Sequence, residues 1–385
     1  MNENEFTSQI AGKLVWEQNG AYYRFEPNFL PIKIKETPEL SAQAQKTIAA
    51  LARLDGLTLK FSPEEIALFQ TPFMVKEAQL SSEIEGTRST ISDVYREEKI
   101  KEPDPEKRLD NEEIRNYKTA LLWAIDNLPE KFTEEYLKSI HRKLLQGVRG
   151  SDKDPGQYKI HQNAIGKRKD TLDSAKFVPA SPRRTPALMK NLIKFSNEDA
   201  LSALYKVGQI HYQFEAIHPF RDGNGRLGRM LIVLQLCKEN ILQHPLLYVS
   251  EYLTRNRDTY LDLLYHVSAK GEIEEWLLFF LKALEFQAKK SLDLLIKIDV
   301  YKKELYDGIQ SISQSPKMHL VIDSLFKQPF FTVNDIKEIL GTSQPTAWSL
   351  VNKLIKAGIV KHIGNQGNTK IYLAEKIILL LEGKA

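Results

Sequence analysis

The chain has 385 residues, of which 42% are hydrophobic and 27% are charged, and its formal net charge is +4. Such a length exceeds one ordinary hydrophobic core and predicts two or three domains of soluble, globular composition. A surplus of four charges neither requires nor excludes nucleic acid as a partner, because a nucleic-acid site needs a local basic patch.

The single cysteine, Cys237, excludes an intramolecular disulfide and a cysteine-based zinc site. It lies in an apolar run, which favours a buried thiol over a reactive one. The chain begins with polar and acidic residues where a secretory signal would be basic and then apolar, and it has no apolar stretch of about 20 residues for a membrane span. We therefore expect a cytoplasmic protein with no membrane partner.

Residues 1–60 are predicted to form a partly irregular N-terminal arm, because prolines at 27, 31 and 38 interrupt it. From residue 61 to about 290 helical periodicity dominates. Apolar residues at helical spacing predict helices over residues 69–84, 111–127, 134–145, 188–197 and 200–214.

A segment rich in glycine and proline, residues 147–186, interrupts these helices. Two short extended runs within it, residues 157–165 and 176–178, are separated by Lys-Arg-Lys-Asp at 167–170 and predict a β-hairpin or flap. Residues 272–309 predict one or two long amphipathic helices. Residues 291–315 are expected to be a helical linker between two domains.

Residues 316–385 predict a separate winged helix-turn-helix domain. The expected order is three helices, over 318–327, 333–340 and 344–356, followed by strands over 359–363 and 369–373.

Residues 218–229, His-Pro-Phe-Arg-Asp-Gly-Asn-Gly-Arg-Leu-Gly-Arg, gather groups that bind a polyphosphate. Gly223 and Gly225 allow backbone N–H groups to point into a concavity, and Asn224 adds an amide donor. Arg226 and Arg229 are three positions apart, on one side of the helix that follows, where their forked guanidinium groups can bind phosphate oxygens. An anion at this helix N-terminus is further favoured by the free N–H groups and the helix dipole.

The same motif offers a base and a metal ligand. Histidine is the residue type that titrates near neutral pH, so His218 is the natural group to remove a hydroxyl proton. Asp222 offers oxygen to Mg²⁺, which binds through one or two carboxylates and completes its shell with phosphate and water. We expect Phe220 to anchor the loop in the core. A helix start with exposed arginines and a core histidine is the alternative interpretation, and it leaves the coincidence of these groups unexplained.

The motif resembles the signature of the Fic family, His-Pro-Phe-x-x-Gly-Asn-Gly-Arg-x-x-Arg, at every fixed position. The resemblance implies a helical fold that transfers AMP from ATP to a Ser, Thr or Tyr hydroxyl of a target protein. It also implies His218 as general base, Asp222 as the Mg²⁺ ligand, and phosphate contacts from a set of neighbouring residues. This set comprises Gly223, Asn224, Gly225, Arg226 and Arg229. A glycine at 225 favours AMP transfer over phosphorylation by analogy with the family.

Residues 81–86, Ser-Ser-Glu-Ile-Glu-Gly, fit the Ser/Thr-x-x-x-Glu-Gly/Asn pattern of the autoinhibitory helix of this family. Their position before the main motif is similar to the class with an N-terminal inhibitory helix. The resemblance implies that Ser81, Glu85 and Gly86 form the inhibitory segment, and that Glu85 pairs with Arg229 in the space of the ATP γ-phosphate. Alone, the short pattern also fits an ordinary solvated helix end.

Two further segments are assigned by resemblance. Asn256 and Tyr260 lie in a stretch that resembles the part of the family that meets adenosine, although packing of Tyr260 in the core is an equal alternative. The flap, residues 156–179, occupies the place of a hairpin that docks the target segment by strand addition. Lys159 stands where the family commonly has arginine, which leaves the target open.

The predicted recognition helix and wing expose polar and mildly basic side chains. The expected set is Ser343, Gln344, Thr346, Ser349, Asn352, Lys353 and Lys356 on the helix, and Lys361, His362, Asn365, Asn368 and Lys370 on the wing. We expect Trp348 to face the core instead. This set is compatible with contacts to DNA phosphates but is poor in arginine, so DNA binding is left open.

The sequence thus predicts a mainly α fold, with a helical Fic core, a small β-hairpin flap and a C-terminal winged helix-turn-helix. The expected domains are residues 1–60, 61–290, 291–315 as linker, and 316–385. The expected function is a protein adenylyltransferase that uses ATP and Mg²⁺ and is inhibited by Glu85. A DNA-binding regulator with a nucleotide-sensing core, or an enzyme that removes AMP, are the alternatives, and homodimer formation is left open.

Overall fold

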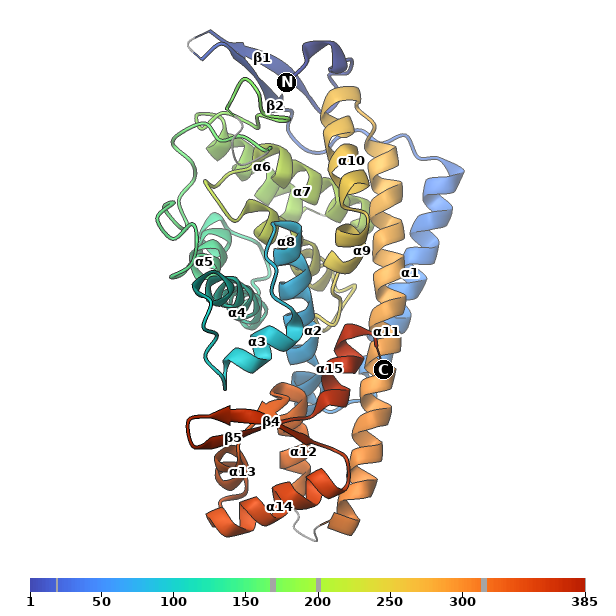
Figure 1. Ribbon diagram of the computed structural model, residues 1–385. Helices are drawn as coiled ribbons and strands as arrows, with labels where there is room; N and C mark the ends of the chain where they lie inside the picture. The colour runs from blue at the N-terminus through green and yellow to red at the C-terminus, as the bar shows by residue number, and fades with distance from the viewer. Residues whose placement is uncertain (19, 167–170, 199–201, 313–316, 385) are drawn as a thin grey trace.

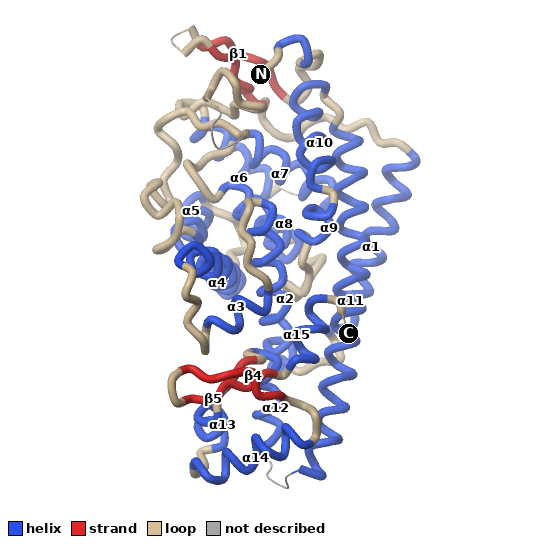
Figure 2. The backbone as a smooth tube through the Cα atoms, in the orientation of Figure 1, coloured by secondary structure: helices blue, strands red, loops and turns tan. Residues whose placement is uncertain are grey.

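The computed structural model describes residues 1–18, 20–166, 171–198, 202–312 and 317–384. The described chain is mainly helical and elongated, with one small antiparallel sheet near each end (Figures 1 and 2). The predicted mainly α fold is confirmed. No helix in the described part of the chain is both long and apolar enough to cross a bilayer.

The N-terminal arm is more regular than predicted. Strands β1 (Gly12–Glu17) and β2 (Tyr22–Pro27) pair antiparallel, with Gly12 opposite Pro27. The hairpin forms because β2 buries Phe25 completely, and Phe25 donates its backbone N–H to the carbonyl of Val178 in the flap at 2.8 Å. Helix α1 (Pro38–Thr58) then packs along the N-terminal half of a much later helix, α11, where Thr47 donates to the carbonyl of Leu281 at 3.0 Å (Figure 1).

In the described residues, nine helices between α1 and α11 form the core of the molecule. They are α2 (Pro63–Ile84), α3 (Ile91–Glu97), α4 (Pro105–Asp126), α5 (Glu134–Leu144), α6 (Thr185–Asn197), α7 (Ala203–Ile217), α8 (Asn224–Lys238), α9 (Ser250–Arg255) and α10 (Arg257–Lys270). Helices α2 and α4 begin six residues before their predicted starts. Ser62 and Asp104 cap their first turns and a proline occupies the first helical position, signals that apolar periodicity alone does not register.

The flap differs from the predicted hairpin. Its two predicted strands contain a single β-bridge, in which Ile165 and Phe177 exchange backbone hydrogen bonds of 2.8 and 3.1 Å. Residues 167–170, which were predicted to separate the two runs, and Ala200, where a helix was predicted to begin, lie outside the described residues. The rest of the flap is held by side chains rather than by a strand ladder.

The predicted long helical stretch after residue 272 is one helix, α11 (Ile273–Ile312), which runs along most of the molecule (Figure 1). Beyond it lies the C-terminal unit, residues 318–382. Its elements are α12 (Met318–Lys327), β3 (Phe330–Phe331), α13 (Val333–Leu340), α14 (Gln344–Lys356), β4 (Lys361–Gln366), β5 (Thr369–Leu373) and α15 (Glu375–Glu382). Its three strands pair in the order β3-β5-β4, and the three helices match the predicted bounds. The predicted boundary at 315/316 lies outside the described residues.

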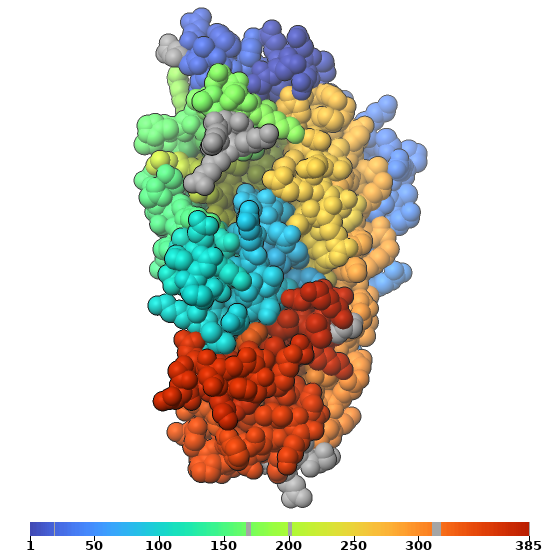
Figure 3. Space-filling view, in the orientation of Figure 1, coloured from blue at the N-terminus to red at the C-terminus, as the bar shows by residue number. Residues whose placement is uncertain are grey.

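The C-terminal unit contacts the segment between α3 and α4 (Figure 3). Lys99 pairs with Asp335 of α13 at 2.8 Å, and the backbone N–H of Lys101 donates to the side chain of Gln366 at 3.1 Å. Helix α12 also packs on α2. The inhibitory helix predicted from the sequence therefore lies between the core and the C-terminal unit.

Candidate active site

The twelve-residue motif, residues 218–229, forms the turn between α7 and α8 and the first residues of α8. His218 follows the last residue of α7 in a left-handed conformation, with φ 49° and ψ 61°, and its N–H donates to Phe214 at 2.9 Å. Gly223 precedes α8 and is also left-handed, with φ 74°. Phe220 between them is completely buried and stacks on His141 at 3.8 Å between ring centroids, which confirms its predicted role as the loop anchor.

Asn224 has a task within the loop itself, while its predicted phosphate contact stays a prediction. Its side-chain carbonyl accepts from the N–H of Phe220 at 2.8 Å, and its amide donates to the carbonyl of Phe220 at 2.8 Å. The side chain is therefore used to close the loop, and it is 1% exposed. Asn224 fixes the shape of the anion-binding turn by holding Phe220 at both backbone groups.

Two residues that sequence reasoning missed hold this loop from outside. His141 of α5 accepts from the N–H of Gly156 through Nδ1 at 2.8 Å, so its Nε2–H donates to the carbonyl of Asp222 at 2.8 Å. Burial lowers the pKa of His141 to about 4, which keeps it neutral in this role. The amide of Asn163 donates to the carbonyls of His218 and Phe220 at 3.1 and 2.9 Å. Neither residue belongs to a sequence pattern, because both act from separate segments.

Lys159 of the flap supports the end of α7. Its ammonium donates to the carbonyl of Ile217 at 2.9 Å and to Asn163 at 2.8 Å, and its backbone N–H donates to Pro219 at 2.8 Å. The side chain is 2% exposed, and burial holds its pKa well below the ordinary value. The flap therefore positions His218 through backbone contacts on both sides of it.

Arg229 and Glu85 form an ion pair at the centre of the site. Arg229 Nη2 lies 2.7 Å from Glu85 Oε1. Its Nε donates to the hydroxyl of Ser81 at 2.9 Å, and its Nη2 donates to the backbone carbonyl of Ser81 at 2.9 Å. The Arg229 side chain is 1% exposed and that of Glu85 is 43% exposed. Burial would lower the pKa of Arg229, but Glu85, Tyr260 and Glu215 together raise it above the ordinary value. The pair predicted between α2 and α8 is therefore present in the structure.

Gly225 allows this pair to form. A Cβ atom at position 225 would overlap Glu85 Oε1 and lie 2.9 Å from Arg229 Nη1. The carboxylate thus rests against the first turn of α8, where the helix N-terminus favours negative charge. Gly86 follows with φ 102°, a conformation that favours glycine and turns the chain away from the site.

Helix α2 is fixed by contacts along its length. Glu77, two turns before Glu85, accepts from the N–H and hydroxyl of Ser250 at 2.9 and 2.6 Å and from Tyr117 at 3.2 Å. Burial raises the pKa of Glu77 to about 7, partly offset by these hydrogen bonds. Arg257 donates to the carbonyl of Ile84 at 3.2 Å and so caps the end of the helix.

Arg226 is buried, and not all of its N–H groups are hydrogen-bonded in the described residues. It is 4% exposed and lies 3.4 Å from Glu113 and 3.6 Å from Asp222 Oδ1. Within the described residues its Nε and Nη1 have no hydrogen-bond partner. Buried guanidinium N–H groups are normally satisfied, so these donors indicate an anion that binds here. Glu113, which sequence reasoning missed, also binds Arg149 at 2.6 Å and so links α4 to the site.

The two residues assigned to adenosine have different surroundings. Tyr260 is 2% exposed and its hydroxyl lies 2.9 Å from His211 Nε2, so the core-packing alternative is the one observed. Asn256 is partly exposed at the junction of α9 and α10, where its amide donates to the carbonyl of Tyr252 at 2.9 Å.

Asp222 has the features of a ligand for a hard cation. Its Oδ1 accepts from the N–H of Gly223 at 2.6 Å, and its side chain is 42% exposed. Among the described residues no group of three or more His, Cys, Asp or Glu side chains could hold a metal by itself. A single exposed carboxylate beside phosphate-binding groups fits Mg²⁺ that binds together with a polyphosphate.

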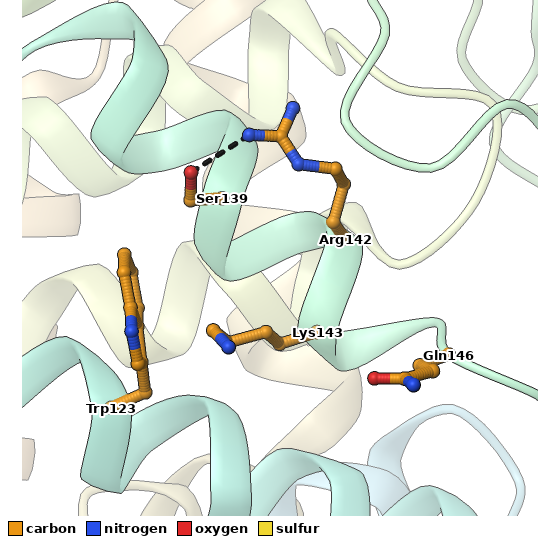
Figure 4. A pocket seen from close by; sticks show the side chains of 5 residues that line it. All are labelled: Trp123, Ser139, Arg142, Lys143 and Gln146. Carbon is orange, nitrogen blue, oxygen red and sulfur yellow. Dashed lines mark hydrogen bonds between the residues drawn. The ribbon is translucent and has the colours of Figure 1, made fainter.

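The cleft between α4 and α5 is separate from this site (Figure 4). It has a volume of about 450 Å³ and is lined by Trp123, Ser139, Arg142, Lys143 and Gln146, none of which belongs to the motif. Arg142 donates to Ser139 at 2.8 Å, and Lys143 lies over the Trp123 ring at 4.9 Å.

The fold and the turn define a helical domain in which a buried arginine near the start of α8 pairs with a carboxylate from the end of α2. Residues 131–236 match the profile of the Fic/DOC family, and residues 41–126 match that of the Fic/DOC family N-terminal region. These two matched regions of the chain therefore belong to the Fic/DOC family.

Relatives and solved structures agree with this assignment. A probable protein adenylyltransferase of Aquifex aeolicus is 29% identical over 205 residues, covering 53% of this chain and 58% of the relative. The protein adenylyltransferase Fic of Drosophila erecta is 28% identical over 109 residues, 25% of this chain and 21% of the relative. The chain thus spans less than two thirds of these relatives. A Fic family protein of Desulfovibrio desulfuricans shares the fold at a TM-score of 0.58 and 19% identity, covering 88% of this chain and 97% of the other.

Proposed function

We propose that this protein transfers AMP from ATP to a Ser, Thr or Tyr hydroxyl of a target protein, and that its own Glu85 inhibits the reaction. The observation that carries the proposal is the 2.7 Å pair between Arg229 and Glu85 in the first turns of α8. Arg229 is one of the two phosphate-binding arginines of the motif, and a carboxylate from a different helix now occupies it.

The proposed reaction assigns one task to each group. His218 removes the proton of the target hydroxyl, and the oxygen attacks the α-phosphorus of ATP. A bond forms from this oxygen to the α-phosphorus while the bond to the bridging oxygen breaks, and pyrophosphate leaves. Arg226, with its two unsatisfied donors, and the N–H groups at the start of α8 hold the phosphates in line.

Mg²⁺ would be held by Asp222 together with phosphate oxygens, and it supplies positive charge against the triphosphate. The side chain of Asp222 is aimed by the contact of its own carbonyl with His141. Because ATP and Mg²⁺ are abundant in the cytoplasm, we place the reaction there.

Inhibition follows from competition for Arg229. Its guanidinium can pair with Glu85 or with the γ-phosphate of ATP, and Glu85, which packs against Gly225, is the partner in this structure. With Glu85 in place, the triphosphate is displaced from the in-line geometry that transfer needs. Docking of the target segment, by contrast, is assigned to the flap. Ile165 and Phe177 of the flap already form a β-bridge with each other, to which a target strand could be added.

The test is to incubate the Glu85→Gly protein and the wild-type protein with ATP labelled at the α-phosphate, Mg²⁺ and a bacterial lysate. We expect label on the protein itself or on a lysate protein, stronger with Glu85→Gly and absent from a His218→Ala control. Glycine is suitable because Glu85 is the C-cap residue that follows the last residue of α2, so helix propensity is little affected. No label, with ATP binding intact, contradicts the proposal; loss of an AMP-removing activity in Glu85→Gly would instead favour the reverse reaction.

The C-terminal unit supports a second function, binding of double-stranded DNA. Residues 339–374, which include α14 and the β4–β5 hairpin, contain four lysines and no aspartate or glutamate, so their charge of +4 equals that of the whole chain. The exposed side of α14 presents polar side chains beside Trp348, which is 53% exposed rather than buried as predicted. The exposed polar residues of α14 are Gln344, Thr346, Ser349, Lys353 and Lys356.

The shape of this surface also fits DNA. A cleft of about 560 Å³ lies at the turn between α13 and α14, lined by Thr342, Thr346 and Lys353 among others. A helix after such a turn is the element that enters the major groove in helix-turn-helix proteins. The test is a gel shift of a fluorescent 20-base-pair duplex by the full-length protein at several salt concentrations. Salt-dependent binding supports this function, and absence of binding at about 50 mM salt rejects it.

A further inference from the structure

Glu215 in the last turn of α7 has no established task. Its Oε2 lies 3.7 Å from Nδ1 of His218, three residues further along the chain. Within the described residues, neither Glu215 Oε1 nor His218 Nδ1 has a hydrogen-bond partner, and both atoms are buried. Buried polar atoms are normally paired, so the unpaired Nδ1 and the carboxylate that approaches it through Oε2 indicate a contact that tightens during the reaction.

The surroundings of Glu215 keep it ionised. Burial would raise its pKa, but His218, His211 and Arg229 outweigh that effect and lower the pKa below the ordinary value. His211 belongs to α7 and Arg229 to α8. Tyr260 of α10 is the remaining titratable group near the carboxylate, and Glu215 contributes to the raised pKa of this phenol. The carboxylate is thus a fixed negative charge beside His218.

Helix packing rather than hydrogen bonding fixes its position. A Cβ atom at Gly228 of α8 would overlap Glu215 Oε1 and lie 3.1 Å from the Phe214 ring. Gly228 therefore lets α7 and α8 approach closely enough to enclose the carboxylate. The side chain keeps 11% of its surface accessible, compared with 20% for His218.

The backbone of His218 is already held, which leaves its ring to be oriented. Its N–H donates to Phe214, and its carbonyl accepts from Asn163 at 3.1 Å. Among the groups around the ring, only Glu215 faces Nδ1 within 4 Å as an ion-pair partner in the described residues. A proton on Nδ1 that points to this carboxylate leaves Nε2 with a free lone pair.

We propose that Glu215 is a positioning residue for the general base, a proposal that rests on the proposed function. It selects the tautomer with the proton on Nδ1 and so aims Nε2 at the target hydroxyl. When Nε2 takes the hydroxyl proton, the imidazolium that forms is stabilised by the adjacent carboxylate. The new bond joins the hydroxyl oxygen to the α-phosphorus, pyrophosphate leaves, and His218 later returns the proton to solvent. Glu215 itself stays ionised throughout.

The test is Glu215→Gln in the Glu85→Gly background, because glutamine keeps the shape that packs against Gly228. We expect kcat to fall about 10- to 100-fold with KM for ATP unchanged, as for other residues that orient a catalytic group. The acid limb of the pH–rate profile should move to lower pH, because loss of the negative charge disfavours the protonated ring. Glu215→Asp should recover part of kcat and return the limb toward its original position.

Asp299→Asn serves as the matched control. Asp299 is a nearly buried carboxylate of α11 that binds Lys60 at 3.0 Å and has no part in the motif. We expect it to leave the acid limb in place. A Glu215→Gln protein that is folded, by its circular dichroism and Tm, but has an unchanged rate and limb would overturn the proposal. So would a rate loss with no shift of the limb.

A measurement without turnover separates this proposal from the proposed function. The ring signals of His218 are followed by NMR against pH in the wild-type and Glu215→Gln proteins, with no ATP present. A transition at lower pH in Glu215→Gln is expected whether or not AMP is transferred, and an unchanged transition contradicts the role of Glu215. Failure of the Glu85→Gly protein to transfer AMP would contradict the proposed function alone.

Discussion

The first turns of α8 and the exposed side of α14 both carry cationic side chains, but these side chains differ in their burial and in their partners. At α8 the guanidinium groups of Arg226 and Arg229 are 5% and 1% exposed, and each has a carboxylate within 4 Å. Along α14 and the β4–β5 hairpin the four lysines stand in a stretch of sequence without acidic residues. Buried cations with internal partners can exchange one anion for another, whereas exposed cations attract a polyanion directly.

Because of this difference, the site at α8 is suited to act as a switch, whereas the exposed side of α14 is suited to act as a docking surface. Exchange at Arg229 costs little when a phosphate replaces Glu85, because the guanidinium is never left without a negative partner. Binding at α14 depends on released counterions, and Lys361 of the hairpin would exchange its surface partner, Glu375 at 2.7 Å, for a phosphate. Experiments that act on buried pairs should therefore affect catalysis, and those that act on screened surface charge should affect DNA binding.

The largest effect is expected for the base at the α7–α8 turn. His218→Ala in the Glu85→Gly background should lower the rate of AMP transfer about 10²- to 10⁴-fold, the usual contribution of a general base. DNA binding by the same protein should be unchanged. The measurement is transfer of label from α-labelled ATP, with the gel shift as control; a parallel loss of both would show that the two regions are not independent.

Removing the carboxylate of Glu85, which pairs with the buried Arg229, should have the next largest effect. Glu85→Gly should raise the transfer rate about 10²-fold, because the triphosphate regains the in-line pose at Arg229. Initial rates of wild-type and variant at saturating ATP measure this. Glu85→Gln, which keeps the side-chain length but not the charge, should lie between them; equal rates for Gln and wild type would assign inhibition to shape rather than to charge.

Salt distinguishes the two cationic sites directly. Raising salt from about 50 to 200 mM should weaken DNA binding about 10²-fold if four lysines contact phosphates. The basal transfer rate of the wild-type protein should change little, since the Arg229 side chain is 1% exposed and its 2.7 Å contact with Glu85 is far shorter than the distance over which salt screens charges. Fluorescence anisotropy of labelled DNA and labelled-ATP assays in the same buffers provide the comparison. A transfer rate that rises steeply with salt would indicate an exposed pair.

A single surface lysine should have a smaller and uniform effect. Lys356→Gln or Lys370→Gln should reduce the slope of log affinity against log salt by about 1, with no change in AMP transfer. Lys384→Gln, in the last residues of the chain and paired with Glu382 at 2.8 Å, is the matched control and should leave the slope unchanged. Equal slopes in all three variants would remove α14 and the hairpin as the DNA surface.

The smallest effect concerns the anchor of α2. Burial raises the pKa of Glu77 from 4.5 to about 7, so the stability that this group contributes is fully present below pH 4.5 and is lost as pH rises through about 7. Glu77→Gln cannot ionise and should lack this loss. The difference in Tm between the variant and the wild-type protein should therefore increase in favour of the variant from pH 4.5 to 7.5. A constant difference would show that Glu77 titrates near its ordinary value.

Local patterns were sufficient for much of the fold. The bounds of α13 and α14 follow from a capping threonine or serine and from apolar spacing, and both match the prediction. The β1–β2 hairpin was missed because its stability depends on Phe25, which is buried only when the flap lies beside it. Trp348 was expected in the core because of its side chain, but the helix turns it outward.

The sequence by itself determined the motif, its helix and the presence of an acidic segment at 81–86, because these depend on residue type and short spacing. Only the tertiary structure decided that Glu85 reaches Arg229, 144 positions away, since this pair requires α2 and α8 to pack side by side with a glycine at the contact. It also gave Asn224 a loop-closing task, buried Tyr260, and brought His141, Lys159 and Glu113 to the site. Contacts of this kind arise from the packing of separate segments, and no local pattern encodes them.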